Sequence, residues 1–144
     1  MTESMRPTES RLPLDVLQRA SLRGNEYAWP IEDIPKVIEA ARQANLASIG
    51  GQLQLRLPDG GTCECYWIEV DTYKSVPASL PWQERINQTA AVALADFSRL
   101  LSHLQSTSTA LKRRAATRLR RCALSGILMM ANLRLTRRSH RAMA

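Results

Sequence analysis

Two runs of β-type pattern around one turn signal constrain the fold of this chain most strongly. Residues 52–57 alternate between glutamine or arginine and leucine, which is the period-two pattern of a strand with one wet face. Pro58-Asp59-Gly60-Gly61 follows, where proline presets φ and the glycines accept positive φ. Residues 62–73 are then rich in tyrosine, tryptophan, isoleucine and valine, which favour strands. The sequence therefore predicts a β-hairpin.

A lone hairpin is only marginally stable in water, so it needs a cover. Asp33 can cap a helix that ends near Asn45, and its apolar stripe at i, i+3, i+4 and i+7 consists of Ile34, Val37, Ile38 and Ala41. A longer helix is predicted over 82–104, with one face formed by Ile86, Ala90, Ala93, Leu94, Phe97, Leu100, Leu101 and Leu104. The expected fold class is α+β: a β-hairpin or small antiparallel sheet packed against two amphipathic helices, with a basic C-terminal tail.

Charge suggests how the chain is divided. All 13 acidic residues lie at or before Asp96, so residues 1–110, with 10 basic residues, carry a net charge of −3, whereas residues 111–144 carry +10. We expect a polar, poorly ordered N-terminal segment over 1–23, an α+β core domain over 24–104, and a linker and basic tail over 105–144 that is helical or disordered. A functional basic arm and a shifted or read-through reading frame over GC-rich DNA both fit the composition of the tail.

Several classes of protein are not expected. No stretch approaches the roughly 20 apolar residues of a membrane span, and the polar start does not resemble a secretory signal, so a cytoplasmic location is predicted. Gly50-Gly51 and Gly60-Gly61 lack the spacing of a nucleotide-binding loop. Cys63 and Cys65 would share a strand face and could meet a soft metal ion, but packing in the core is the favoured interpretation. No metal and no cofactor are predicted.

An enzyme is the weaker interpretation. Glu64, Glu69 and His103 are the candidates for acid or base, and carboxylates serve such roles only when burial or proximity separates their pKa values. No nucleophile motif accompanies them, so no catalytic residue is assigned.

The favoured interpretation is a non-enzymatic binding module that recognises a protein partner through the hairpin face. The predicted partner-binding residues are acids and tyrosines of the second strand: Glu64, Tyr66, Glu69, Asp71 and Tyr73. Regular alternation would place Glu69 and Asp71 on one face and Glu64 on the other. Acidic groups beside tyrosines suit a basic partner.

The alternative is an accessory protein that binds nucleic acid through its basic tail without reading sequence, because no aromatic residue follows Phe97. The predicted phosphate contacts are Lys112, Arg113, Arg114, Arg118, Arg120, Arg121, Arg137 and Arg138. Binding to an anionic membrane surface is a further alternative, through an apolar patch formed by Leu119, Cys122, Ala123, Ile127, Met130 and Ala131. A homodimer is compatible with these interpretations.

Residues 24–73 read GNEYAWPIEDIPKVIEAARQANLASIGGQLQLRLPDGGTCECYWIEVDTY. In its residue pattern this stretch resembles small uncharacterised bacterial proteins of the mobile gene cassette type. The resemblance implies a bacterial cytosolic accessory protein and carries no functional residues to transfer. It also implies that the tail, which does not share this residue pattern, is an appended or read-through segment.

Overall fold

A computed structural model describes residues 6–57, 62–72, 75–119 and 128–138; over 62–70, 103–119 and 128 it describes the course of the backbone. Within these ranges one antiparallel sheet has the strand order β1-β2-β5-β3-β4. The strands are β1 (Ser21–Arg23), β2 (Glu26–Pro30), β3 (Ala47–Arg56), β4 (Thr62–Asp71) and β5 (Leu128–Thr136). The helices are α1 (Leu14–Gln18), α2 (Ile34–Gln43) and α3 (Trp82–Leu119), with single 3₁₀ turns η2 (Thr8–Arg11) and η3 (Ile31–Asp33). The α+β class and the β3–β4 hairpin are confirmed.

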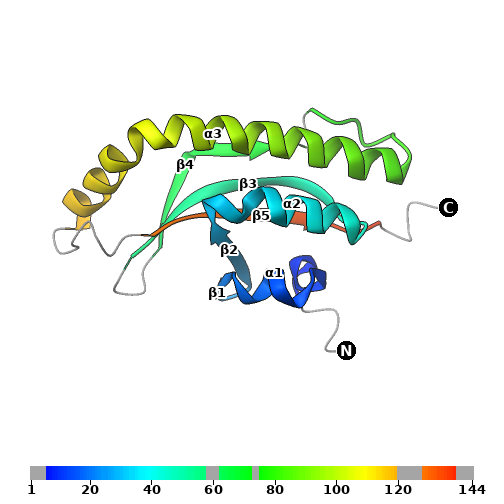
Figure 1. Ribbon diagram of the computed structural model, residues 1–144, viewed down its shortest axis with the longest axis horizontal. Helices are drawn as coiled ribbons and strands as arrows, with labels where there is room; N and C mark the ends of the chain where they lie inside the picture. Colours follow the sequence, from blue (N-terminus) through cyan, green and yellow to red (C-terminus); the bar gives the residue numbers. More distant parts are fainter. Residues whose placement is uncertain (1–5, 58–61, 73–74, 120–127, 139–144) are drawn as a thin grey trace.

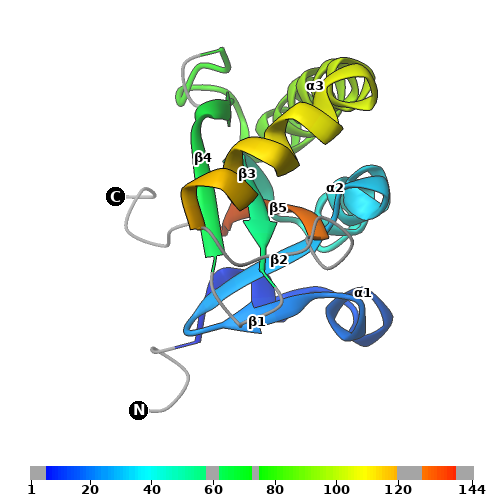
Figure 2. The ribbon, with the colours of Figure 1, turned by 90° about the vertical axis from the view of Figure 1, so that its left-hand side faces the viewer.

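Helices α2 and α3 lie side by side on one face of the sheet (Figure 2). The core between these layers is apolar, and its members include Trp29, Ile34, Phe97 and Leu133, each at most 4% exposed. The predicted stripe of α2 is buried as a whole. On α3, Ile86, Ala90, Ala93 and Phe97 are buried as predicted, but Leu94 is 41% exposed because it lies at the margin of the buried stripe.

The C-terminal region contributes β5, which lies between β2 and β3 in the interior of the sheet. Ala131, Leu133 and Leu135 are buried against the helices. The predicted domain boundary is therefore wrong for residues 128–136, since these side chains complete the core and do not belong to a tail. The membrane-surface interpretation fails for Met130 and Ala131 as well, because both are buried in the sheet.

The predicted linker after residue 104 is wrong, because α3 continues without interruption to Leu119; of the two states predicted for this segment, helical and disordered, residues 105–119 take the helical one. Its last turns pass over the end of the sheet where β3 ends and β4 begins (Figure 1). No proline or glycine occurs between residues 82 and 119 to break the helix. Among the helices of the described ranges, none has the length and apolar character to cross a membrane.

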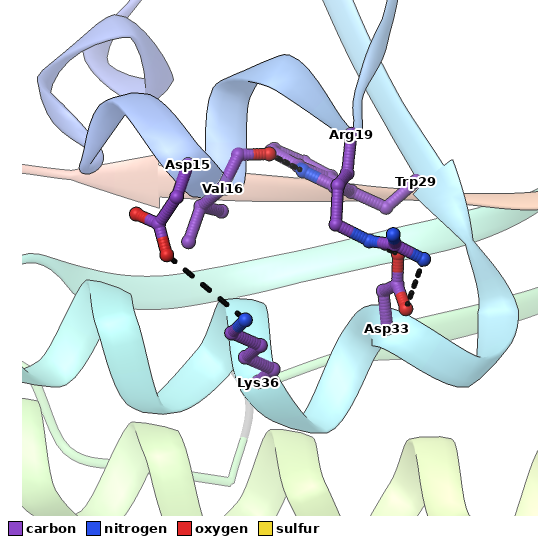
Figure 3. Close-up of polar contacts among 6 residues, drawn as sticks. All are labelled: Asp15, Val16, Arg19, Trp29, Asp33 and Lys36. Atoms are coloured by element: carbon purple, nitrogen blue, oxygen red, sulfur yellow. Dashed lines mark hydrogen bonds and ion pairs between the residues drawn. The ribbon is translucent and has the colours of Figure 1, made fainter.

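The N-terminal segment is ordered from residue 6, contrary to expectation, because the core and α2 hold it. Val16 is 4% exposed, and its carbonyl oxygen accepts a hydrogen bond from Trp29 Nε1 at 3.0 Å (Figure 3). On the surface, Arg19 Nε lies 2.5 Å from Asp33 Oδ2. Glu9 accepts a hydrogen bond from the backbone N–H of Leu135 at 2.9 Å. This segment is therefore part of the domain.

The ends of α2 follow two different local rules. Asp33 has helical backbone angles and makes no side-chain capping bond, because its carboxylate pairs with Arg19; the predicted cap is wrong. At the other end Asn45 has φ 60°, and Leu46 N–H bonds to Ala41 O at 2.9 Å. This left-handed termination is one that asparagine and glycine tolerate, and the predicted stop is confirmed.

Candidate functional site

Strand β4 is the long outer strand of the sheet, because β3 pairs with it on one side and no described strand pairs with it on the other. It is ten residues long, whereas β1, at the other edge, has three. Glu64, Tyr66 and Glu69 are residues of β4, and Asp71 is its exposed last residue. Tyr73, also predicted for partner binding, lies outside the described residues.

The acidic positions of β4 share one face of the sheet. In the ladder, Glu64, Glu69 and Asp71 lie opposite Gln54, Gln52 and Gly50, respectively, which alternate along β3. Residues 66–68 of β4 interrupt the pairing at a point where β3 has no extra residue. An odd insertion reverses the alternation of the strand that carries it. The prediction that Glu64 would take the other face is therefore wrong.

This acidic face is the one opposite the helices. Gly51, the neighbour of Gln52 on β3, faces α3, since a Cβ built on it would lie 2.9 Å from Phe97 Cζ. The alternate positions of β3 therefore face away from the helices. On that face β3 and β5 carry a row of polar side chains, called here the polar strip: Gln52, Gln54, Arg56 and Asn132.

The polar strip is buried, although its alternation predicts a wet face. Gln54 is fully buried, and the other three side chains are at most 6% exposed. If β2 ran straight, its register with β5 would place Glu26 opposite Arg134. The β5 residue opposite Gln54 is Met130, which lies four residues from Arg134 along the strand. Four residues of strand span about 13 Å. Glu26 Oε1 nevertheless accepts a hydrogen bond from Gln54 Nε2 at 3.2 Å, so β2 bends across this face.

The bend begins where β2 leaves β5. The last paired residue of β2 on this side is Ala28, opposite Asn132. Beyond it, Asn132 Nδ2 donates to the Tyr27 carbonyl at 2.9 Å, so a side chain replaces the ladder at this point. Figure 1 shows β2 descending from the level of β5 toward β1 and α1. The tip of the β1–β2 hairpin, residues 21–27, therefore covers part of the polar strip.

Two charged residues of the hairpin, Arg23 and Glu26, act on the buried Arg56 of the polar strip. Burial lowers the pKa of the Arg56 guanidinium, the Arg23 cation lowers it further, and the Glu26 carboxylate opposes both effects. Arg56 is 3% exposed, so its charge is held among protein groups. The strip thus places buried amides and a buried cation beside the acidic positions of β4.

The basic residues predicted to bind phosphate do not form one arm. Lys112, Arg113, Arg114 and Arg118 lie in the last turns of α3, whereas Arg137 and Arg138 are exposed and follow β5. These two segments end at opposite ends of the molecule (Figure 1). Arg120 and Arg121 lie outside the described residues. The sheet therefore separates the predicted contacts into two groups.

The described residues assemble no recognisable catalytic or metal site. Within these ranges no three histidine, cysteine or acidic side chains gather as metal ligands. A cavity of about 10 Å³ between α1 and α2 is lined by Val16, Arg19, Trp29, Asp33, Lys36 and Val37. That volume suits one water molecule. Cys63 and Cys65 occupy β4 opposite Leu55 and Leu53, and His103 lies on α3.

Sequence reasoning missed Asn132 and the burial of the polar strip. The alternation of residues 52–57 was visible in the sequence, but a solvent-exposed polar face and a buried polar face produce the same residue pattern. Asn132 stood in a segment interpreted as tail. The alternating run Met130-Ala131-Asn132-Leu133-Arg134-Leu135 was the available signal for a strand there.

The comparisons with known proteins give no match to a family model, to a curated protein or to a solved structure. The resemblance to bacterial gene cassette proteins therefore stays a prediction.

Proposed function

We propose that this protein is a non-enzymatic binding module that recognises a basic, extended segment of a protein partner through β4. The observation that carries the proposal is the placement of Glu64, Glu69 and Asp71 at positions on one face of an outer strand. An outer strand offers unpaired backbone groups to an added strand, and the alternate side chains set specificity.

The rest of the molecule supports this proposal. The helices cover the other face of the sheet (Figure 2), so they do not lie over the acidic positions of β4. Strand β1, with three residues, is too short to offer a comparable edge. A second copy of the chain could use the same edge of β4, which would give a homodimer.

The test uses synthetic twelve-residue peptides with lysine at every second position, and matched peptides that carry the same lysines in one block. The full chain should bind the alternating peptide more tightly, because alternate residues of a strand meet one face. The triple variant Glu64→Gln, Glu69→Gln, Asp71→Asn should weaken that binding by about tenfold or more, since three charge contacts are lost. Fluorescence anisotropy measures the dissociation constants.

The control is an equal charge change on the rest of the surface: Asp15→Asn, Glu32→Gln, Glu84→Gln, all at exposed positions. Binding by this variant should stay near that of the parent protein. Equal loss in both triple variants would show that net charge, and not the β4 face, attracts the peptide. Sedimentation of the parent and the β4 variant tests whether the edge instead pairs two copies.

As a second candidate, we propose non-specific binding of nucleic acid by the last turns of α3. Residues 111–119 hold four basic residues and no acidic one on a continuous helix. Duplex DNA binding would then weaken with salt, with a slope of log affinity against log salt of roughly −0.9 for each phosphate neutralised. Arg113→Gln with Arg114→Gln should make the slope shallower, whereas Arg137→Gln with Arg138→Gln should leave it unchanged. A complex insensitive to salt would contradict this candidate.

A further inference from the structure

The tip of the β1–β2 hairpin extends beyond the ladder that joins its base to the sheet. At the base, Trp29 is fully buried and its indole N–H is bonded to Val16 O. The ladder to β5 extends only over Ala28–Pro30. Beyond Ala28, side-chain hydrogen bonds from Asn132 to Tyr27 and from Gln54 to Glu26 join the tip to the sheet, and the Tyr27 ring stacks on that of Trp29.

In each of these two hydrogen bonds the side-chain amide donates through its nitrogen, and its oxygen is left without a donor. Gln54 Oε1 and Asn132 Oδ1 are buried and have no hydrogen-bond partner among the described residues. A flip of either amide does not help, because each NH₂ group already faces an oxygen that can only accept: Glu26 Oε1 and Tyr27 O. A buried acceptor without a donor destabilises the closed state, and a hydrogen bond from water would remove this cost.

The charges under the tip act in the same direction. Arg23 belongs to the tip, and its cation lowers the pKa of the buried Arg56 guanidinium. The half-exposed Arg23 cation thus disfavours the charge of the buried Arg56, although Glu26 compensates in part. Movement of the tip away from β3 would hydrate the two amide oxygens and separate the arginines.

We propose that residues 21–27, the β1–β2 flap, open locally about a hinge at Ala28 and expose the polar strip while the rest of the sheet stays folded. The base does not follow, because Trp29 is fixed in the core. The flap turns at Gly24, whose φ is 60° and whose added Cβ would meet no atom within 4 Å. Its role as a gate beside the acidic positions of β4 rests on the proposed function, whereas the opening itself does not.

The test is native-state hydrogen exchange of the full chain, followed residue by residue by NMR. Amides of residues 21–27 should exchange at least about a hundredfold faster than those of Trp29 and of residues 130–135, because local openings cost less than global unfolding. Exchange of the flap should also be insensitive to low denaturant, which marks an opening that exposes little surface.

Gly24→Ala sharpens the test, because it strains the turn without a steric clash. It should speed exchange of the flap by about five- to tenfold. Residues 130–135 exchange through global unfolding, which releases the same strain, so they should speed up by no more than the flap does and stay about a hundredfold or more slower. Asn25→Ala, in the same turn, is the matched control and should change flap exchange less than Gly24→Ala does.

Three results would overturn the proposal. The first is protection of residues 21–27 equal to that of β5. The second is exchange of Trp29 together with the flap, which would remove the hinge. The third is a Gly24→Ala variant in which exchange of the flap is no faster than in the parent protein, since opening of the flap would then not release the strained turn. Peptide binding by β4 enters none of these readouts, so a failure of the proposed function would be seen separately.

Discussion

Phe97 packs against Gly51 so closely that no side chain fits between them: a Cβ on Gly51 would lie 2.9 Å from Phe97 Cζ and 2.0 Å from the Asn132 carbonyl oxygen. Gly51→Ala should therefore destabilise the protein by about 2–3 kcal/mol or more, because the clash involves backbone that cannot move aside. Urea unfolding measures the change. Gly24→Ala, where the space is open, should cost only about 1 kcal/mol; equal effects would contradict this packing.

Leu133 tests whether β5 is structural. It is fully buried in the core, so Leu133→Ala should reduce the free energy of unfolding by about 2–5 kcal/mol. Leu94→Ala is the control, because Leu94 is 41% exposed and its loss should cost less than about 1 kcal/mol. A neutral Leu133→Ala variant would mean that residues 128–136 are an appended tail after all.

Trp29 tests the attachment of the N-terminal segment. Trp29→Phe keeps an aromatic ring but removes the donor to Val16 O, and it should cost about 1–3 kcal/mol because a buried bond and some packing are lost. Thermal unfolding followed by circular dichroism measures it. Removal of residues 1–19 should cost more than Trp29→Phe, because it also deletes the buried Leu12 and Val16; full stability of that truncated chain would contradict the assignment.

Asn45 tests the end of α2. Its φ of 60° is strained for a branched residue, so Asn45→Val should destabilise the protein by about 1–2 kcal/mol. Asn45→Gly should be at least as stable as the parent protein, since glycine is the commonest residue at such helix ends. Chemical denaturation of both variants gives the comparison, and a tolerated valine would contradict the left-handed geometry.

Glu39 tests a surface ion pair. The hydrogen bond from Arg42 lowers the pKa of the Glu39 carboxyl below its ordinary value of 4.5. The pair therefore stabilises the fold above pH 4.5, and its contribution is lost as the pH falls through the lowered pKa. In an NMR titration, Arg42→Ala should raise the pKa of Glu39. An unchanged titration would show that the pair does not form in solution.

The elements with strong local patterns were predictable from the sequence. The hairpin was predictable from the alternation of residues 52–57, the turn signal and the strand-favouring residues of 62–73. Helix α2 was predictable from its apolar stripe and Asn45, because each of these patterns has one simple structural solution. The α+β class followed from the need to cover the hairpin.

The features that failed depend on contacts between distant residues. Nothing local distinguishes an Asp33 that caps α2 from one that pairs with Arg19. The interruption at residues 66–68 of β4 reverses alternation without a glycine or proline to mark it, so the face taken by Glu64 could not be assigned. Strand β5 was hidden by the arginines around it, which dominate composition but not packing.

The position of β5 also dictates an order of events during synthesis. Asn132 meets Tyr27 across 105 residues of chain, so β2 and β3 have no partner between them until the segment that ends at Thr136 has left the ribosome. Non-local pairing of this kind slows folding and leaves apolar strands exposed while it is awaited. A nascent chain stalled before residue 128 should therefore depend on chaperones to stay unaggregated.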